Sequence, residues 1–257
     1  MARVLITGGS GLIGRRVIEA FNGVDVELIV AGRPDADLLV PRALARLLDR
    51  RRPDVVVHLA WSASALAEYR HHDDNWRWAE TTIETAELAA DRGIRFLATG
   101  TSVDAAPADD AYSRSKAAVR EALADRIRAG ELGWLRPFYV FDEERPSPAV
   151  LRAALAAKAA GEPVRLVSPQ ARHDFVHARD VGTAIRTVVA ASLAGIIDLG
   201  SGTVATVADL VEAYDCEWVP DGVPSPAAAS EDVADVRFLR ANGWVPEVTD
   251  RMLGRTV

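Results

Sequence analysis

Tyr112 and Lys116 are the residues of this chain whose types and spacing best suit proton transfer. Residues four apart on a helix share a face, so the lysine ammonium would lie close to the phenol. A cation about 4 Å away contributes roughly 4 kcal/mol at an effective dielectric constant near 20. That energy would lower the pKa of the tyrosine from about 10 to about 7 and allow proton exchange with a carbonyl or hydroxyl group at neutral pH. Thr101, eleven residues upstream of Tyr112, could hydrogen-bond the same reacting oxygen.

Three glycines, at positions 8, 11 and 14, are spaced to receive a phosphate group. They follow a short apolar run, 4–7, and precede an amphipathic stretch, 15–21. Without a Cβ atom the backbone can adopt a positive φ and approach a pyrophosphate, and a helix N-terminus directs its N–H groups toward the same anion. The spacing differs from the usual dinucleotide motif, Gly-x-Gly-x-x-Gly, and a simple tight turn would also produce it. Its place between a strand and a helix favours a dinucleotide.

The elements that must position these groups alternate between strand and helix. Strands are expected over 4–7, 26–30, 54–59, 94–99, 134–141 and 196–199, and helices over 15–21, 75–91 and 111–129 and before residue 50. Uninterrupted apolar strands are typical of a parallel sheet that is covered on both faces. We therefore expect an α/β fold, a doubly wound parallel sheet of the Rossmann type. Residues 1–145 would form its dinucleotide-binding core. Residues 146–257, which are rich in proline, would form a small C-terminal substrate-binding lobe, and the segment at about 180–200 would return to the core.

Composition excludes several other classes of protein. The chain has 257 residues, of which 49% are hydrophobic, so it can build a full core. Its net charge of −7 argues against a nucleic-acid partner. Cys216 is the one cysteine, which leaves no disulfide framework, and we expect no metal site, because the His and Asp cluster at 71–74 suits a solvated turn. No apolar run of membrane-spanning length and no secretory leader are evident, so a cytoplasmic protein without a membrane partner is expected.

With these residues in place, the chain resembles an extended short-chain dehydrogenase/reductase of the NAD-dependent epimerase/dehydratase family over nearly its whole length. The matching segments are the glycine motif 7–14, Asp37-Leu38, His58-Leu59-Ala60, Asn75 with Glu84, Leu135-Arg136-Pro137, Asp174-Phe175-Val176-His177, Asp180-Val181, Leu199-Gly200-Ser201-Gly202 and Gly243-Trp244-Val245-Pro246. The resemblance implies a catalytic triad of Thr101, Tyr112 and Lys116. With Arg33 and Trp61, at which the chain departs from the family, the expected set of dinucleotide-binding residues is Gly8, Ser10, Gly11, Leu12, Ile13, Gly14, Arg33, Asp37, Leu38, Leu59, Ala60, Trp61, Thr99, Tyr112, Lys116 and Pro137.

The chain departs from that family in ways that bear on the cofactor. NAD-preferring relatives place an aspartate after the second strand to bind the ribose 2′-hydroxyl, whereas this chain has Gly32 and then Arg33. A guanidinium there can bind a 2′-phosphate, so we favour NADP(H). The alternative is NAD(H), with Asp35 on the ribose and Arg33 in solvent.

Other departures bear on the substrate. Relatives often carry an arginine directly before the Asp174-Phe175 pair and use it on a substrate pyrophosphate, but here that residue is His173, with Arg172 before it. Either Arg172 takes over this role or the substrate lacks a diphosphate, and Arg172 and His173 are the candidate substrate-binding residues. The segment between Thr101 and Tyr112 is short, which suggests an open pocket. Trp61 replaces a small residue and would either wall the pocket or fill core space.

The resemblance implies a small-molecule substrate that is a nucleotide-linked keto-deoxysugar. We expect this substrate to be reduced with NADPH, because a site selective for NADP(H) suits a dinucleotide that is consumed as hydride donor. The first alternative is a nucleotide-sugar epimerase, or less well a dehydratase, with tightly bound NAD. A second is a dinucleotide-binding regulator without catalysis, which the intact Tyr112 and Lys116 disfavour. In relatives the helices expected over 75–91 and 111–129 pair across a two-fold axis, so a homodimer is expected.

Overall fold

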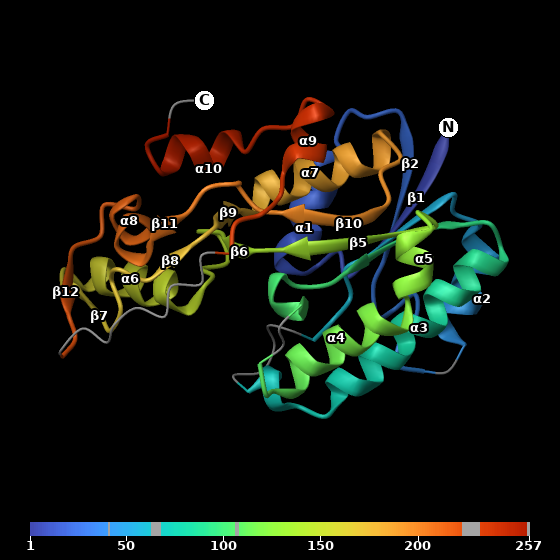
Figure 1. Cartoon of the computed structure of the whole chain (residues 1–257), viewed down its shortest axis with the longest axis horizontal. Coiled ribbons are helices and arrows are strands. Elements are labelled where there is room, and N and C mark those ends of the chain that lie inside the picture. Colours follow the sequence, from blue (N-terminus) through green and yellow to red (C-terminus); the bar gives the residue numbers. More distant parts are fainter. Residues whose placement is uncertain (41, 63–67, 106–107, 223–231, 256–257) are drawn as a thin grey trace. The chain divides into compact units, whose positions relative to one another are not determined.

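The computed structural model describes residues 1–40, 42–62, 68–105, 108–222 and 232–255 (Figure 1). The chain divides into two compact units. The first comprises Met1–Arg136 and Ile185–Ile197, and the second comprises Pro137–Ala184 and Asp198–Val257.

A six-stranded sheet organises the first unit, and its strand order is β10-β5-β4-β3-β1-β2. The strands are β1 (Ala2–Thr7), β2 (Val26–Ala31), β3 (Val55–His58), β4 (Arg95–Thr99), β5 (Leu132–Pro137) and β10 (Gly195–Leu199). β1 pairs in parallel with both β2 and β3, β3 with β4, and β4 with β5. The expected doubly wound α/β class is therefore confirmed. The strand order reverses beside β1, at the carboxyl ends of β1 and β3, where ligands bind in sheets of this kind.

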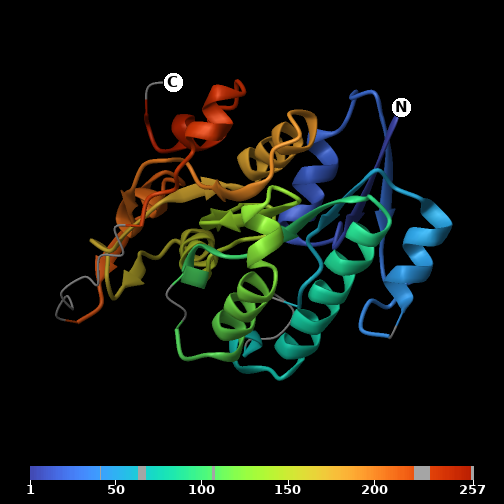
Figure 2. The ribbon, with the colours of Figure 1, turned by 45° about the vertical axis from the view of Figure 1, so that its right-hand side comes forward.

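Helices cover both faces of this sheet (Figures 1 and 2). They are α1 (Leu12–Ala20), α2 (Ala43–Arg51), α3 (Asp74–Asp91), α4 (Ala111–Ala122) and α5 (Ala124–Arg128), with short 3₁₀ turns η1 (Tyr69–His71) and η2 (Ser102–Ala105). Figure 2 shows α3 and α4 side by side on one face, and α1 lies on the other. The helix expected over 111–129 is interrupted at Leu123, whose φ of −98° and ψ of 7° leave the helical range. Its buried side chain keeps the apolar pattern unbroken across the interruption, so the sequence does not reveal it.

The described residues of the second unit form three two-stranded sheets. β6 (Tyr139–Phe141) pairs with β9 (Phe175–His177), β7 (Val164–Leu166) with β12 (Trp218–Pro220), and β8 (Arg172–His173) with β11 (Ala205–Thr206). Its helices are α6 (Ala149–Ala160), α8 (Val207–Glu212), α9 (Arg237–Ala241) and α10 (Glu247–Met252), and α7 (Ala178–Ala190) is shared between the units.

The single strand expected over 134–141 is wrong, because the chain changes sheets at Phe138. Pro137, the last residue of β5, has no N–H group to continue a ladder. The next N–H, of Phe138, donates to the Leu199 carbonyl, and β6 then pairs with β9. An apolar run cannot show which of two sheets each of its halves joins.

Two buried carboxylates account for the two aspartate motifs of the second unit. Asp174 accepts hydrogen bonds from the N–H groups of Ser201, Gly202 and Ala234 and from the Ser201 hydroxyl. Asp180 accepts from the N–H and hydroxyl groups of Thr249. Burial raises the pKa of each carboxyl group, and these hydrogen bonds oppose that shift. Both motifs therefore join segments that are distant in the sequence and have a structural role.

Candidate active site

The turn between β1 and α1 is shaped so that side chains stay out of it. Gly8 has a φ of 72°, and a Cβ atom there would lie 2.7 Å from the Ala60 nitrogen. A Cβ atom on Gly14 would overlap the Gly8 carbonyl oxygen. α1 has Gly11 as its N-cap residue, with no capping side chain and no acidic residue in its first turn. Its first amide groups and its positive dipole end thus suit an anion, and the turn fits the pyrophosphate of a dinucleotide.

A buried hydrogen-bonded chain joins this turn to the end of β3. The Ala60 N–H donates to Thr7 Oγ1, which lies 2.9 Å from His58 Nδ1. On its other side His58 Nε2 lies 3.2 Å from Thr82 Oγ1, whose hydroxyl donates to the Trp78 carbonyl. Burial, and then the charge of Lys116, lowers the pKa of His58 to about 3, so the ring is neutral. The Thr7 hydroxyl can therefore donate to Nδ1 and Nε2–H to Thr82, which fixes Ala60 beside Gly8.

Tyr112 lies in the first turn of α4 and is half-buried. Its ring meets the edge of Tyr69 at 5.4 Å between centroids and that of Trp61 at 6.3 Å. A hydrogen bond between the Thr101 side chain and the phenol acts to lower the pKa of Tyr112. The structure therefore brings together Thr101 and Tyr112, as the sequence predicted.

Lys116 is almost completely buried one helical turn further along α4. Its Nζ atom donates to the Thr99 carbonyl at 2.5 Å and lies 3.5 Å from the centre of the Trp61 ring. Burial lowers the pKa of Lys116 to about 7, although the charge of Asp104 opposes this. Trp61 thus contacts the ammonium group directly and is more than a filler of core space.

The expected lowering of the Tyr112 pKa is wrong for this structure. Burial raises the pKa of the phenol far above its ordinary value, and the charge of Tyr69 adds to the effect. Thr101 and Arg70 oppose the shift, while the Lys116 ammonium is directed to Thr99 and Trp61. The helical spacing predicted the shared face correctly, but the aromatic groups that desolvate the phenol come from segments outside that helix.

Asn75 holds the aromatic wall of the site. Its Oδ1 accepts from Trp61 Nε1 at 2.8 Å, and its Nδ2 donates to the carbonyls of Tyr69 and His72. One side chain thus fixes both Trp61 and the η1 turn that carries Tyr69.

Asp104 is a site residue that the sequence analysis missed. It is buried in η2 and accepts hydrogen bonds from Trp134 Nε1 at 2.7 Å, from Arg120 and from the Thr101 N–H. Its charge raises the pKa of Lys116 and of Tyr112. The available signal was an acidic residue three positions beyond Thr101 and five beyond the end of β4.

The residues expected near an adenosine lie on the surface after β2. Arg33, Asp35 and Asp37 are all exposed, whereas Leu38 is partly buried. Asp35 accepts from the Gly32 N–H at 3.1 Å and pairs with Arg51 at 3.6 Å. Asp35 therefore already has two partners within the protein.

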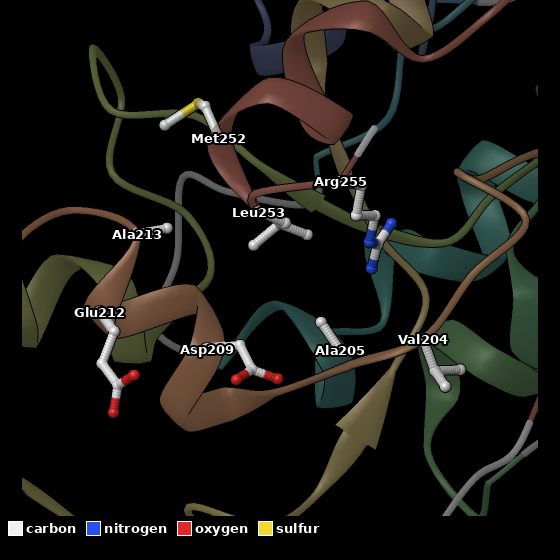
Figure 3. A pocket seen from close by; sticks show the side chains of 8 residues that line it. All are labelled: Val204, Ala205, Asp209, Glu212, Ala213, Met252, Leu253 and Arg255. Atoms are coloured by element: carbon white, nitrogen blue, oxygen red, sulfur yellow. The ribbon is translucent and has the colours of Figure 1, made fainter. Parts of the chain in front are cut away.

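The substrate candidates and Pro137 belong to the second unit, and their roles stay predictions. Arg172 is exposed, and the His173 ring stacks on Tyr139 at 3.8 Å between centroids. The same unit has a cavity of about 360 Å³ (Figure 3). It is lined by Val204, Ala205, Asp209, Glu212, Ala213, Met252, Leu253 and Arg255.

The described residues contain no group of three or more His, Cys, Asp or Glu side chains arranged to hold a metal ion. No helix within the described ranges has both the length and the apolar character needed to cross a bilayer.

Comparison with known proteins decides the family. The model of the NAD dependent epimerase/dehydratase family matches residues 4–200. The chain belongs to this family. It is accordingly an enzyme with a dinucleotide cofactor, which its glycine turn fits.

Individual proteins similar to this chain are consistent with membership of the family. It is similar to 2'-dehydrokanamycin reductase of Streptomyces kanamyceticus, at 29% identity over 96% of this chain and 76% of the relative. Its fold is similar to that of UDP-glucose 4-epimerase of Thermus thermophilus, solved with NAD, with a TM-score of 0.73 and 23% identity over 95% and 94% of the two chains. It is also similar to ADP-L-glycero-D-manno-heptose-6-epimerase of Helicobacter pylori, with a TM-score of 0.74 and 17% identity over 95% and 91%.

Proposed function

We propose that this enzyme reduces a ketone on a sugar ring with a nicotinamide dinucleotide. The observation that carries the proposal is the hydrogen bond between Thr101 and Tyr112, with Lys116 one turn further along the same helix. All three belong to the first unit, which also holds the glycine turn. The name of the relative from Streptomyces kanamyceticus, a reductase of a dehydro sugar compound, supports this direction of reaction.

Each residue has a role that its surroundings suit. The dinucleotide, when bound, supplies the hydride. Tyr112 donates a proton to the ketone oxygen, and Thr101 donates a hydrogen bond to the same oxygen. A general acid must be protonated before it acts, and burial keeps the phenol of Tyr112 protonated at neutral pH. Lys116 would hold the ribose beside the nicotinamide.

The substrate that the family resemblance implies is a nucleotide-linked keto-deoxysugar. A keto-aminoglycoside is a second candidate, because the relative named for such a compound matches 96% of this chain. Where relatives often have an arginine that binds the substrate diphosphate, this chain has His173, whose ring is stacked on Tyr139. This difference favours a substrate without a diphosphate.

The test is a panel of both substrate classes with added NADPH or NADH, followed by the loss of dinucleotide absorbance. Tyr112→Phe should reduce turnover by about 10²- to 10⁴-fold and leave dinucleotide affinity unchanged. Arg114→Gln, on the exposed side of the same helix, is the matched control. Turnover of a nucleotide sugar without added dinucleotide would support an epimerase instead, and full function in Tyr112→Phe would support a regulator.

For the cofactor we propose a preference for NADP(H), with Arg33 on the 2′-phosphate. The support is that Asp35, the alternative ribose ligand, already binds the Gly32 N–H and Arg51. A hydrogen bond to a charged group is worth about 1.5–3 kcal/mol. Arg33→Gln should therefore weaken NADPH binding about tenfold or more and leave NADH binding within about twofold. Equal losses for the two dinucleotides would overturn the preference.

The homodimer and the cytoplasmic location expected from the sequence stay predictions. Exposed Trp76 on α3 is consistent with a helix that pairs with a second copy. Light scattering on the purified protein tests the dimer directly.

A further inference from the structure

Arg70 lies against the ring of the proposed proton donor. Its guanidinium carbon is 5.5 Å from the centre of the Tyr112 ring, whereas Lys116 Nζ is 6.0 Å from the same point. Arg70 comes from η1, which precedes α3, and so is more than forty residues away from Tyr112 in the sequence. A cation above the face of an aromatic ring is attracted by it and stabilises negative charge on it.

The guanidinium is held at the start of the helix that carries Tyr112. Arg70 donates to Asp110 Oδ2 at 2.6 Å and to Ser113 Oγ at 3.0 Å. Asp110 is the N-cap residue of α4, and its other oxygen accepts from the Ser113 N–H at 2.8 Å. The carboxylate that begins the helix therefore also sets the position of the cation relative to the tyrosine two residues later.

Asp110 does not cancel the effect of Arg70 at the ring. The carboxylate is itself bound by the Ser113 N–H and lies at the positive end of α4, which offsets its negative charge. The backbone of η1 is also fixed, because Asn75 Nδ2 donates to the Tyr69 carbonyl at 2.6 Å. Arg70 is therefore held at both its backbone and its head group.

The other ionisable groups around Tyr112 are less well placed to stabilise its anion. From η1 Tyr69 adds no positive charge, and from η2 Asp104 is negative and paired with Arg120. From α4 the Lys116 ammonium is directed to the Thr99 carbonyl and the Trp61 ring. Both Tyr69 and Asp104 act to raise the pKa of Tyr112, and Arg70 acts to lower it.

We propose that Arg70 is a positioning residue that stabilises the phenolate of Tyr112 once the phenol has given up its proton, and that Asp110 holds it in place. The inference rests on the proposed role of Tyr112 as proton donor. It assigns to this enzyme a second cation beside the tyrosine, supplied by the turn before α3 and not by the tyrosine's own helix.

The test titrates the phenol without substrate or dinucleotide. A fluorinated tyrosine is incorporated at position 112, because fluorine lowers the phenol pKa into the range where the protein stays folded. The ultraviolet absorbance of the phenolate is then followed against pH in otherwise unchanged protein and in the Arg70→Gln, Arg70→Lys and Arg114→Gln variants. Arg114→Gln is the matched control, since it also removes one positive charge from α4. Arg114 lies on the exposed surface of this helix, where it pairs with Asp109.

We expect Arg70→Gln to raise the titration midpoint by about one pH unit and Arg114→Gln to leave it unchanged. Arg70→Lys keeps the positive charge, so it should raise the midpoint by at most half as much as Arg70→Gln does. If Arg70→Gln does not fold, the double variant Arg70→Gln/Asp110→Asn, which leaves no lone buried carboxylate, should raise the midpoint in the same direction. A midpoint that follows the Arg114→Gln control in these variants overturns the proposal. Because the titration uses no substrate, failure of the ketone assay would not alter its result. An unchanged midpoint would refute the proposed role of Arg70 even if the enzyme reduces ketones.

Discussion

The buried ammonium of Lys116 should make the fold less stable at neutral pH than at alkaline pH. Burial lowers the pKa of Lys116 from 10.5 to about 7. Between these two values the unfolded chain binds a proton that the folded chain does not, so the free energy of unfolding rises with pH across that window. Below about pH 7 both states carry the proton, and the full cost of burying the charge remains.

The size of the effect follows from the shift in pKa. At 1.36 kcal/mol per pKa unit, burial of the Lys116 amine lowers the free energy of unfolding by about 4 kcal/mol at pH 7 and by about 1 kcal/mol at pH 9.5. Lys116→Met removes this cost, because methionine is apolar and of similar length. It also removes the hydrogen bond to Thr99, worth about 1 kcal/mol. The variant should be more stable than the unchanged protein by about 3 kcal/mol at pH 7 and of about equal stability at pH 9.5.

Urea denaturation of the dinucleotide-free protein at several pH values between about 7 and 9.5 measures this. Lys158 provides the control, because it is the other lysine of the chain and is about half exposed. Lys158→Met should run parallel to the unchanged protein, whereas Lys116→Met should show a slope smaller by about 3 kcal/mol over the range. Parallel curves for all three proteins would refute the argument that burial of Lys116 weakens the fold.

Three further predictions concern contacts around the site. Gly14→Ala should weaken dinucleotide binding at least about tenfold, since its Cβ would overlap the Gly8 carbonyl oxygen. Titration calorimetry measures this affinity. It should show no such loss in the control Gly32→Ala, whose Cβ would meet only Pro34 at 3.5 Å. Thr82→Val should lower the free energy of unfolding by about 1–3 kcal/mol, because it leaves His58 Nε2 buried without its partner; an unchanged melting temperature would contradict the buried chain. Trp134→Phe should cost a similar amount, about 1–3 kcal/mol, by removing the indole N–H that donates to buried Asp104, and equal stability in urea would count against that role.

Much of this enzyme could be predicted without its structure, because the signals are local. The glycines at 8 and 14 are dictated by a turn in which a Cβ atom has no room, and that turn lies where the sequence placed it. Asp110 is the N-cap residue of the helix that carries Tyr112, a position for which aspartate is one of the preferred residues. Uninterrupted apolar strands between helices predicted the parallel sheet, since both faces of such a sheet are covered.

The tertiary structure alone decided the electrostatics of the site. The pKa of Tyr112 is set by desolvation, and the rings and the cation around it come from Trp61, Tyr69 and Arg70, some forty to fifty residues upstream. The same holds for Asp104, whose partner Trp134 lies on β5. Spacing along a helix determines which side chains share a face, and the sequence showed that much. The energy of a charge on that face depends on which distant segments exclude water from it, and only the folded chain brings those segments together.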